Sequence, residues 1–292
     1  MGSEPYHVRY NRHMMRYGLG HALFEPQSSH DLKPGSCGYL DHNGTWRQLL
    51  DLTDKHAVED AGYLSVDGAN PASARITQYS WGPKHTDTVS YTKLDIKAGV
   101  SGISLGIPAE ASVLIDFKLE KDFGAVLLCA EKVEKSSFHH LNPFRRWAFS
   151  NAVKVLQEFP DVEKYGFHIV TTTYSTTDVY INAWGSKANS VALGFQAGMT
   201  PAGEIAPVAE SYRASSASNW NHPICKDDEK MVVFFSGLLF KYNKLLGWFR
   251  KDKIREVPYR GGEGDSRLII RDPRVDEDAY EVVVSSTGLL LE

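Results

Sequence analysis

Two β-rich stretches of sequence, separated by one helix, limit what this chain can fold into more than any other feature. They cover residues 75–133 and 167–208 of the 292-residue chain. In the first stretch, apolar residues at positions 113, 115, 117 and 119 alternate with Asp116, Lys118 and Glu120. A second alternating run covers 191–195. Because a period of two is typical of a strand with one apolar face, both runs are predicted to form strands.

The helix between the two stretches has clear sequence boundaries. Asn142 is predicted to be its N-cap, Pro143 its first helical residue, and the helix is expected to end before Pro160. Helical spacing places a set of apolar residues on one face, which is typical of a helix that packs on a core. These residues are Phe144, Trp147, Ala148, Val155, Leu156 and Phe159.

The sequence HIVTTTYSTTDVYINAW at 168–184 has the residue types of a strand pair, but the side expected to be apolar is largely threonine. Residues 211–223 are expected to form a loop. The apolar run MVVFFSGLLF at 231–240 is about half the ~20 residues that a membrane-spanning helix needs. A tilted strand needs only about 9–11 residues, so these segments are long enough to cross a membrane only as strands.

Composition places the chain in the ordinary globular class. Hydrophobic residues make up 42% and charged residues 23%, so disorder is not expected. The formal net charge of −4 argues against a dedicated nucleic-acid-binding protein. Cys37, Cys129 and Cys225 are far apart, which favours neither a disulfide framework nor a zinc cluster. The N-terminal residues do not form an apolar signal peptide, so a cytoplasmic protein is expected.

The common catalytic sequence patterns are absent. HExxH, the GxxxxGK[ST] phosphate loop, GxGxxG after a strand and GxSxG do not occur. His139 and His140 are adjacent, and adjacent side chains point apart, so a metal site there is not expected. Cys37 with His42 or His56 is one conceivable nucleophile and base, but a packed cysteine is far more common. We therefore expect no enzyme and no cofactor, while an unrecognised active site stays an alternative.

Basic residues lie beside interfacial aromatic residues in three parts of the sequence. This mixture suits an anionic membrane surface, where each Lys or Arg contributes on the order of 1 kcal/mol. The alternative is a set of ordinary solvated faces. Arg9, Arg12 and Arg16 are expected to share one helical face. The candidate lipid-binding residues are Arg9, Arg12, Arg16, Arg145, Arg146, Lys241, Lys244, Arg250 and Lys251.

The C-terminal part of the sequence changes sign. Residues 236–260 contain seven basic residues against two acidic ones, whereas residues 261–292 contain eight acidic residues against three arginines. This predicts a division into a domain over 1–260 and an acidic tail over 261–292. The tail either masks the basic segment, and so inhibits the protein, or is a solvated end.

The order of elements resembles the pore-forming domain of the gasdermins, and the short chain is similar to the compact fungal members of that family. Three stretches carry the resemblance, which extends over roughly residues 5–250. They are Leu32-Lys-Pro34 with 46–50 (WRQLL), the helix end VLQE at 155–158 with HIVTTTYSTT at 168–177, and VVFFSGLL at 232–239.

The resemblance implies an α+β fold with a central twisted, mainly antiparallel sheet flanked by helices. It implies a cytoplasmic protein that, on activation by a protease or a partner protein, binds acidic phospholipids of the plasma membrane. It then oligomerises with its own copies or a related chain, and inserts hairpins from 88–128 and 168–208 into a large transmembrane barrel. The outcome is lytic, pyroptosis-like cell death. Thr, Ser, Ala and Gly alternating with Val, Ile and Leu suit a strand that later has lipid on one side and water on the other.

The residues that this resemblance assigns to the membrane hairpins are Val113, Ile115, Phe117, Leu119, Ile169, Val179, Ile181, Val191, Leu193 and Phe195. An animal gasdermin also has a large C-terminal inhibitory domain, and no equivalent is expected here. The competing hypothesis is a soluble β-rich binding or interaction module that never enters a membrane.

Overall fold

The computed structural model describes residues 4–66, 74–95, 113–185, 190–197, 205–207, 220–223, 229–245, 266–271 and 279–287. The chain divides into two compact units, each assembled from three separate pieces of sequence. Unit 1 contains Met1–Met14, Tyr79–Val133 and Thr176–Met231, and unit 2 contains Met15–Gln78, Glu134–Ser175 and Val232–Glu292. The fold combines antiparallel sheets with a few helices, in agreement with the predicted mixture of helix and antiparallel strand.

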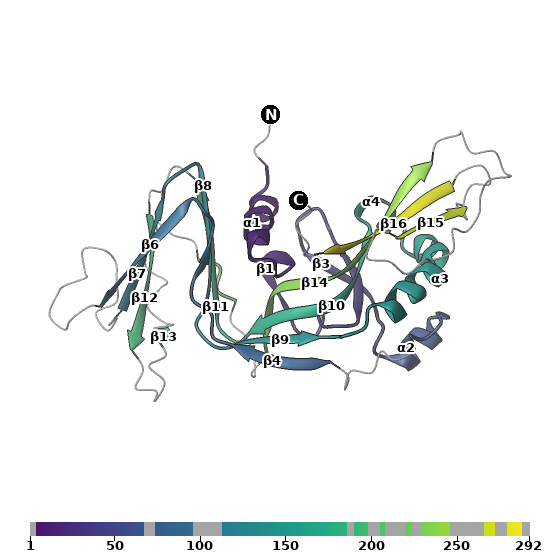
Figure 1. Cartoon of the computed structure of the whole chain (residues 1–292), viewed down its shortest axis with the longest axis horizontal. Helices are drawn as coiled ribbons and strands as arrows, with labels where there is room; N and C mark the ends of the chain where they lie inside the picture. Colours follow the sequence, from purple (N-terminus) through teal and green to yellow (C-terminus); the bar gives the residue numbers. More distant parts are fainter. Residues whose placement is uncertain are drawn as a thin grey trace. The chain divides into compact units, whose positions relative to one another are not determined.

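Unit 2 is built on one sheet, to which the described residues contribute nine strands (Figure 1). The main order is β15-β16-β14-β10-β2-β3, with β1 beside β14 and with β9, which also pairs with β4, beside β10. The strands of this sheet are β1 (His21–Ser28), β2 (Ser36–Leu40), β3 (Trp46–Asp51), β4 (Arg75–Tyr79), β9 (Val133–Ser137), β10 (Phe167–Thr176), β14 (Met231–Leu245), β15 (Ser266–Arg271) and β16 (Ala279–Thr287).

The helices of unit 2 are α2 (Lys55–Asp60), α3 (Asn142–Glu158) and α4 (Val162–Tyr165), together with a 3-10 turn, η1 (Met15–Tyr17). The predicted apolar face of α3 is confirmed, because Phe144, Trp147 and Leu156 are buried in the main core cluster. This face packs with Phe167 of β10 and Phe240 of β14, whose rings stack at 4.8 Å.

The start of α3 differs from the prediction by one residue. Asn142 is itself the first helical residue, and Leu141 is the cap because its carbonyl accepts a hydrogen bond from the Arg145 N–H at 3.1 Å. The N-cap assignment of Asn142 was therefore wrong. The predicted end is confirmed, since the helix stops at Glu158, with Phe159 as its C-cap.

The C-terminal residues are part of the sheet of unit 2. β16 pairs antiparallel with β14 from Ala279 opposite Leu245 to Thr287 opposite Gly237, and β15 pairs with β16. Tyr280, Val282 and Val284 are buried in the main core cluster. The predicted boundary near residue 260 therefore does not separate a tail from a domain, because charge counting overlooked the apolar alternation within 279–287.

Unit 1 contains two smaller sheets and the helix α1 (Tyr6–Met14). One sheet has the order β13-β12-β7-β6, formed by β6 (Val89–Asp95), β7 (Val113–Leu119), β12 (Ser190–Ala197) and β13 (Ile205–Pro207). The other has the order β11-β8-β5, formed by β5 (Lys84–His85), β8 (Phe123–Cys129) and β11 (Val179–Gly185). All the pairings in both sheets are antiparallel.

The strand pair predicted at 168–184 is divided between the two units. β10 pairs with β2 and β9 in unit 2, while β11 pairs with β8 in unit 1, so the two strands do not form a hairpin with each other. β10 is buried on both sides, and Thr171 and Thr173 are among its buried residues. Its threonines therefore belong to a central strand, and the predicted hairpin over 168–208 begins only after residue 176.

Candidate functional site

The candidate site is a two-stranded antiparallel ribbon. One side of the ribbon consists of β7 followed by β8, and the other side consists of β11 followed by β12. Lys118 pairs with Ser190 in one sheet, and Phe123 pairs with Gly185 in the other. The residue numbers of every pair add to 308 in both ladders, as 118 with 190 and 123 with 185 do. One antiparallel register therefore continues from the first sheet into the second, and four residues separate the ladders on each strand.

The faces of this ribbon differ in polarity. Successive residues of a strand point to opposite faces, so a straight ribbon in this register would carry all odd-numbered residues on one face. That face is apolar along the described residues of both ladders; it includes Ile115, Phe117, Leu119, Phe123, Ala125, Leu127, Cys129, Val179, Ile181, Ala183, Val191 and Leu193. The even face is mixed; it includes Asp116, Lys118, Val126, Leu128, Tyr180, Asn182, Trp184 and Ser190.

In this structure the ribbon is folded rather than straight. Figure 1 shows β7 beside β12 and, after a bend, β8 beside β11. The odd face of the β7–β12 half packs on the even face of the β8–β11 half in one core cluster. The members from the two halves are Ile115, Phe117, Val191 and Leu193, and Val126, Leu128, Tyr180 and Trp184. The bend at Glu120, Lys121 and Asp122 is exposed, so it is the part of this strand with least packing.

Burial leaves two hydrogen-bond donors of the ribbon in unfavourable surroundings. Asn182 Nδ2 and Trp184 Nε1 are buried with no hydrogen-bond partner among the described residues. A buried unsatisfied donor costs about 1–3 kcal/mol. The folded ribbon therefore contains polar atoms that contact with water would stabilise.

The helix α1 contacts the odd face of the ribbon at Phe123. The Arg9 guanidinium carbon lies 4.1 Å from the centre of the Phe123 ring, a cation–π contact. The rings of Tyr6 and His13 lie 5.9 Å and 5.4 Å from the same ring. Arg9, a predicted lipid-binding residue, is therefore half-buried in a protein contact.

Arg9 and Arg12 are three residues apart on α1, but Arg16 does not share their helix face as predicted. Arg12 is exposed on α1 and pairs with Glu4. Arg16 lies beyond the end of α1, in η1, where its guanidinium is 5.5 Å from the Tyr17 ring. The prediction of a single helical stripe was wrong because α1 ends at Met14.

The remaining basic candidates belong to unit 2 or lie outside the described residues. Arg146 is exposed on α3, and Lys241 and Lys244 are exposed on β14. Arg145 is half-buried, and its Nε atom has no hydrogen-bond partner in the part of the chain that the structure describes. Arg250 and Lys251 are outside the described residues.

Nine of the ten predicted membrane-hairpin residues lie in the ribbon. Val113 and Phe195 are opposite each other at one end of its register. Ile169 is the exception, because it is buried in unit 2 on β10, opposite Cys37 of β2. Residues 220–223, predicted to be part of a loop, also contact the ribbon, which was not predicted. Trp220 and His222 could have indicated these contacts, since a large aromatic ring in a polar loop usually packs against other residues of the protein.

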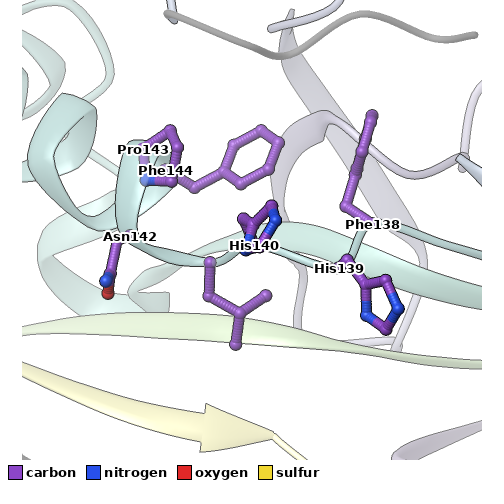
Figure 2. Close-up of a pocket in the computed structure, with 7 residues that line it drawn as sticks. Phe138, His139, His140, Asn142, Pro143 and Phe144 are labelled. Carbon is purple, nitrogen blue, oxygen red and sulfur yellow. The ribbon is translucent and has the colours of Figure 1, made fainter. Parts of the chain in front are cut away.

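A hollow of about 520 Å³ lies at the start of α3. Figure 2 shows that its lining includes His139 and His140, whose rings are 6.1 Å apart and turned in different directions. Among the described residues no group of three or more His, Cys, Asp or Glu is arranged to hold a metal ion. No helix in those same residues is both long and apolar enough to cross a bilayer.

Comparisons with known proteins give a weak similarity in structure. No protein-family model matches the sequence, and no curated protein matches it. Among solved structures, the chain is similar to a bacterial gasdermin from Bradyrhizobium tropiciagri, with 11% sequence identity and a TM-score of 0.27. The similarity covers 79% of this chain and 85% of that one. The proposal that follows therefore depends on the pairing, burial and polarity of this chain's own strands.

Proposed function

We propose that this protein forms pores: it binds acidic phospholipids, oligomerises and inserts β-hairpins into the plasma membrane, which causes lytic cell death. The observation that carries the proposal is the single register of the folded ribbon. Straightening the bend would join β7 to β8 while keeping the pairing of β7 with β12 and of β8 with β11. The joined strand would extend over residues 113–129, which exceeds the about 9–11 residues that a tilted strand needs to cross a bilayer.

The polarity of the ribbon supports this proposal. Membrane strands alternate between a lipid-facing and a water-facing side. The odd face of the ribbon offers an apolar side, and the even face offers Asp116, Lys118 and Asn182 to water. The buried donors of Asn182 and Trp184 would gain hydrogen-bond partners on that wetted face.

Features outside the ribbon support membrane binding and oligomerisation. Arg146, Lys241 and Lys244 are exposed cations, each of which contributes on the order of 1 kcal/mol at an anionic surface. β6 pairs with β7 on one side and, among the described strands, with none on the other. An open strand edge is suited to pairing with another copy or a related chain. In this proposal the protein is no enzyme, and it waits in the cytoplasm until a protease or partner protein activates it.

A change of register at the bend tests the proposal. Inserting one glycine between Lys121 and Asp122 leaves each ladder intact in the folded form, because both residues are exposed. In a straight ribbon it would move one half by a residue and turn its side chains to the wrong face. After activation by limited proteolysis, we expect the wild-type chain to release dye from phosphatidylserine-containing vesicles but not from neutral ones. The insertion is expected to reduce this release at least tenfold.

The matched control inserts two residues, Gly-Ser, between Lys121 and Asp122 and two more between Lys187 and Ala188. This variant keeps both the pairing and the faces, so it should release dye at nearly the wild-type rate. Thermal melts establish that each variant is folded. Equal release by the single-insertion variant contradicts a straightened ribbon. No release by folded wild-type protein, with or without proteolysis, favours a soluble interaction module.

A further inference from the structure

Residues 220–223, Trp-Asn-His-Pro, contact both halves of the folded ribbon. We infer that they are a removable clasp, which holds the ribbon folded and covers the outer edge of β11 until it is displaced. This inference deepens the proposed function, on which it rests, by naming the contact that keeps the protein inactive. It assigns a role to a segment far in sequence from both strands that it joins.

The clasp is attached to the β11 half through backbone hydrogen bonds. Ile181 N–H donates to the Asn221 carbonyl at 2.9 Å, and Asn221 N–H donates to the Ile181 carbonyl at 2.7 Å. Among the described strands β11 is the last of its sheet, with β8 on its other side. The clasp therefore occupies the backbone N–H and C=O of Ile181, at a sheet edge with which another strand could otherwise pair.

The imidazole of His222 also contacts the same half. Its Nδ1 lies 3.0 Å from the Val179 carbonyl, and since a carbonyl oxygen only accepts, Nδ1 carries the proton and donates. The ring stacks on Tyr180 with 4.2 Å between centroids and 2° between planes. The His222 side chain thus contacts both a backbone carbonyl and a side chain of β11.

Trp220 is attached to the other half of the ribbon. Its ring centroid lies 6.1 Å from that of Phe117 on β7, and its Nε1 donates to the Ala192 carbonyl of β12 at 3.3 Å. Phe117 belongs to the core cluster between the two halves, and Trp220 packs against that cluster. Removing the indole therefore weakens the contact of the clasp with β7 and β12 while leaving the backbone bonds to Ile181.

These contacts are incompatible with a straight ribbon. Ile181 is opposite Leu127, which is ten residues from Phe117 along the same strand. Ten residues of extended strand measure about 33 Å. Residues 220 and 221 are adjacent, so their Cα atoms are only about 3.8 Å apart, and two side chains add only a few ångströms each. The clasp must release at least one half before the ribbon straightens.

Hydrogen–deuterium exchange of the full chain in solution, without lipid, tests the clasp. Trp220→Ala is expected to speed exchange of the amides of β11 and β12 at least tenfold. The control is Trp81→Ala, which removes a half-buried indole of the same unit that contacts Lys84 of β5. Since β8 lies between β5 and β11, this variant should leave those amides unchanged. If Trp220→Ala does not fold, Asn221→Pro removes the N–H donor to the Ile181 carbonyl, and the same change in exchange is expected.

Vesicle leakage, measured beside exchange, distinguishes a failure of the clasp inference from a failure of the pore-forming proposal. We expect Trp220→Ala to release dye from phosphatidylserine-containing vesicles at least fivefold faster than the wild-type chain. Unchanged exchange of β11 and β12 in folded variants overturns the clasp, even if the wild-type chain forms pores. Faster exchange without leakage by either protein supports the clasp as a structural contact and overturns the pore-forming proposal.

Discussion

A chain that ends at Arg260 is expected to lose the fold of unit 2 rather than to become active. The truncation removes β15 and β16, and with them three side chains of the main core, Tyr280, Val282 and Val284. Tyr280 is fully buried, and its hydroxyl donates to Glu163 Oε1 at 2.7 Å. Replacing one buried aromatic ring by alanine costs about 3–5 kcal/mol, while whole domains are stable by only about 5–15 kcal/mol. Thermal unfolding followed by circular dichroism will measure the loss.

Two point variants serve as controls for the truncation. Tyr280→Phe keeps the ring and loses only the hydrogen bond, at a cost of about 1 kcal/mol, whereas Tyr280→Ala should cost about 3–5 kcal/mol. Removing only residues 288–292 should have little effect, because β16 ends at Thr287. A chain ending at Arg260 that melts cooperatively at the full-length temperature would contradict the core role of β16. It would also restore the hypothesis of an inhibitory tail.

Acid is expected to destabilise unit 2 through His168. This side chain is buried on β10 between the rings of Trp46 and Phe235, and no hydrogen-bond partner for its Nδ1 is present among the described residues. Burial, with smaller contributions from His21 and Lys241, lowers the pKa of His168 from 6.5 to about 3. The folded protein therefore holds a neutral imidazole above about pH 3.

Low pH lowers the stability of the fold because the unfolded chain binds a proton at His168 more readily than the folded chain does. Well above pH 6.5 His168 is neutral in both states, so its contribution to stability is complete. As the pH falls from 6.5 towards 3, the unfolded chain binds a proton that the folded chain cannot bind. The free energy of unfolding then decreases by about 1.4 kcal/mol per pH unit from this group.

Comparison of the wild-type chain with His168→Leu isolates this effect from other acid-sensitive groups. The free energy of unfolding, measured with urea from pH 7.5 to pH 4.5, should fall more steeply in the wild-type chain by about 1 kcal/mol per pH unit below pH 6. Above pH 7 the difference between the two proteins should be constant, which is the internal control. Parallel curves over the whole range would show that His168 takes up its proton without unfolding.

Local patterns in the sequence predict the elements of this fold better than their partners. The face of α3 that carries Trp147 and Leu156 follows from helical spacing alone, and the alternation at Ile115 and Phe117 follows from strand period. Neither pattern identifies β12 as the strand beside β7, since these strands are about seventy residues apart in the sequence. The division of 168–184 between two units was equally hidden, because a central strand and a hairpin strand share the same residue types.

The candidate basic residues show a second limit of sequence reasoning. Arg9 and Arg146 have the same charge, but Arg9 lies over Phe123 and Arg146 is exposed. Which of them is free to meet a phosphate depends on tertiary packing that charge counting does not include. The clasp was missed for a related reason, since the contacts of Trp220 and His222 are all with residues distant in sequence.

The two buried thiols in the described residues lie in different units, Cys37 in unit 2 and Cys129 in unit 1. Both are protonated and inaccessible in the folded chain, because burial raises the pKa of each. A thiol is modified only when its surroundings open. The chain thus carries a natural chemical reporter on each unit. Alkylation of Cys129 before Cys37 would record an opening of the ribbon that leaves the larger sheet closed, and no label need be engineered into either.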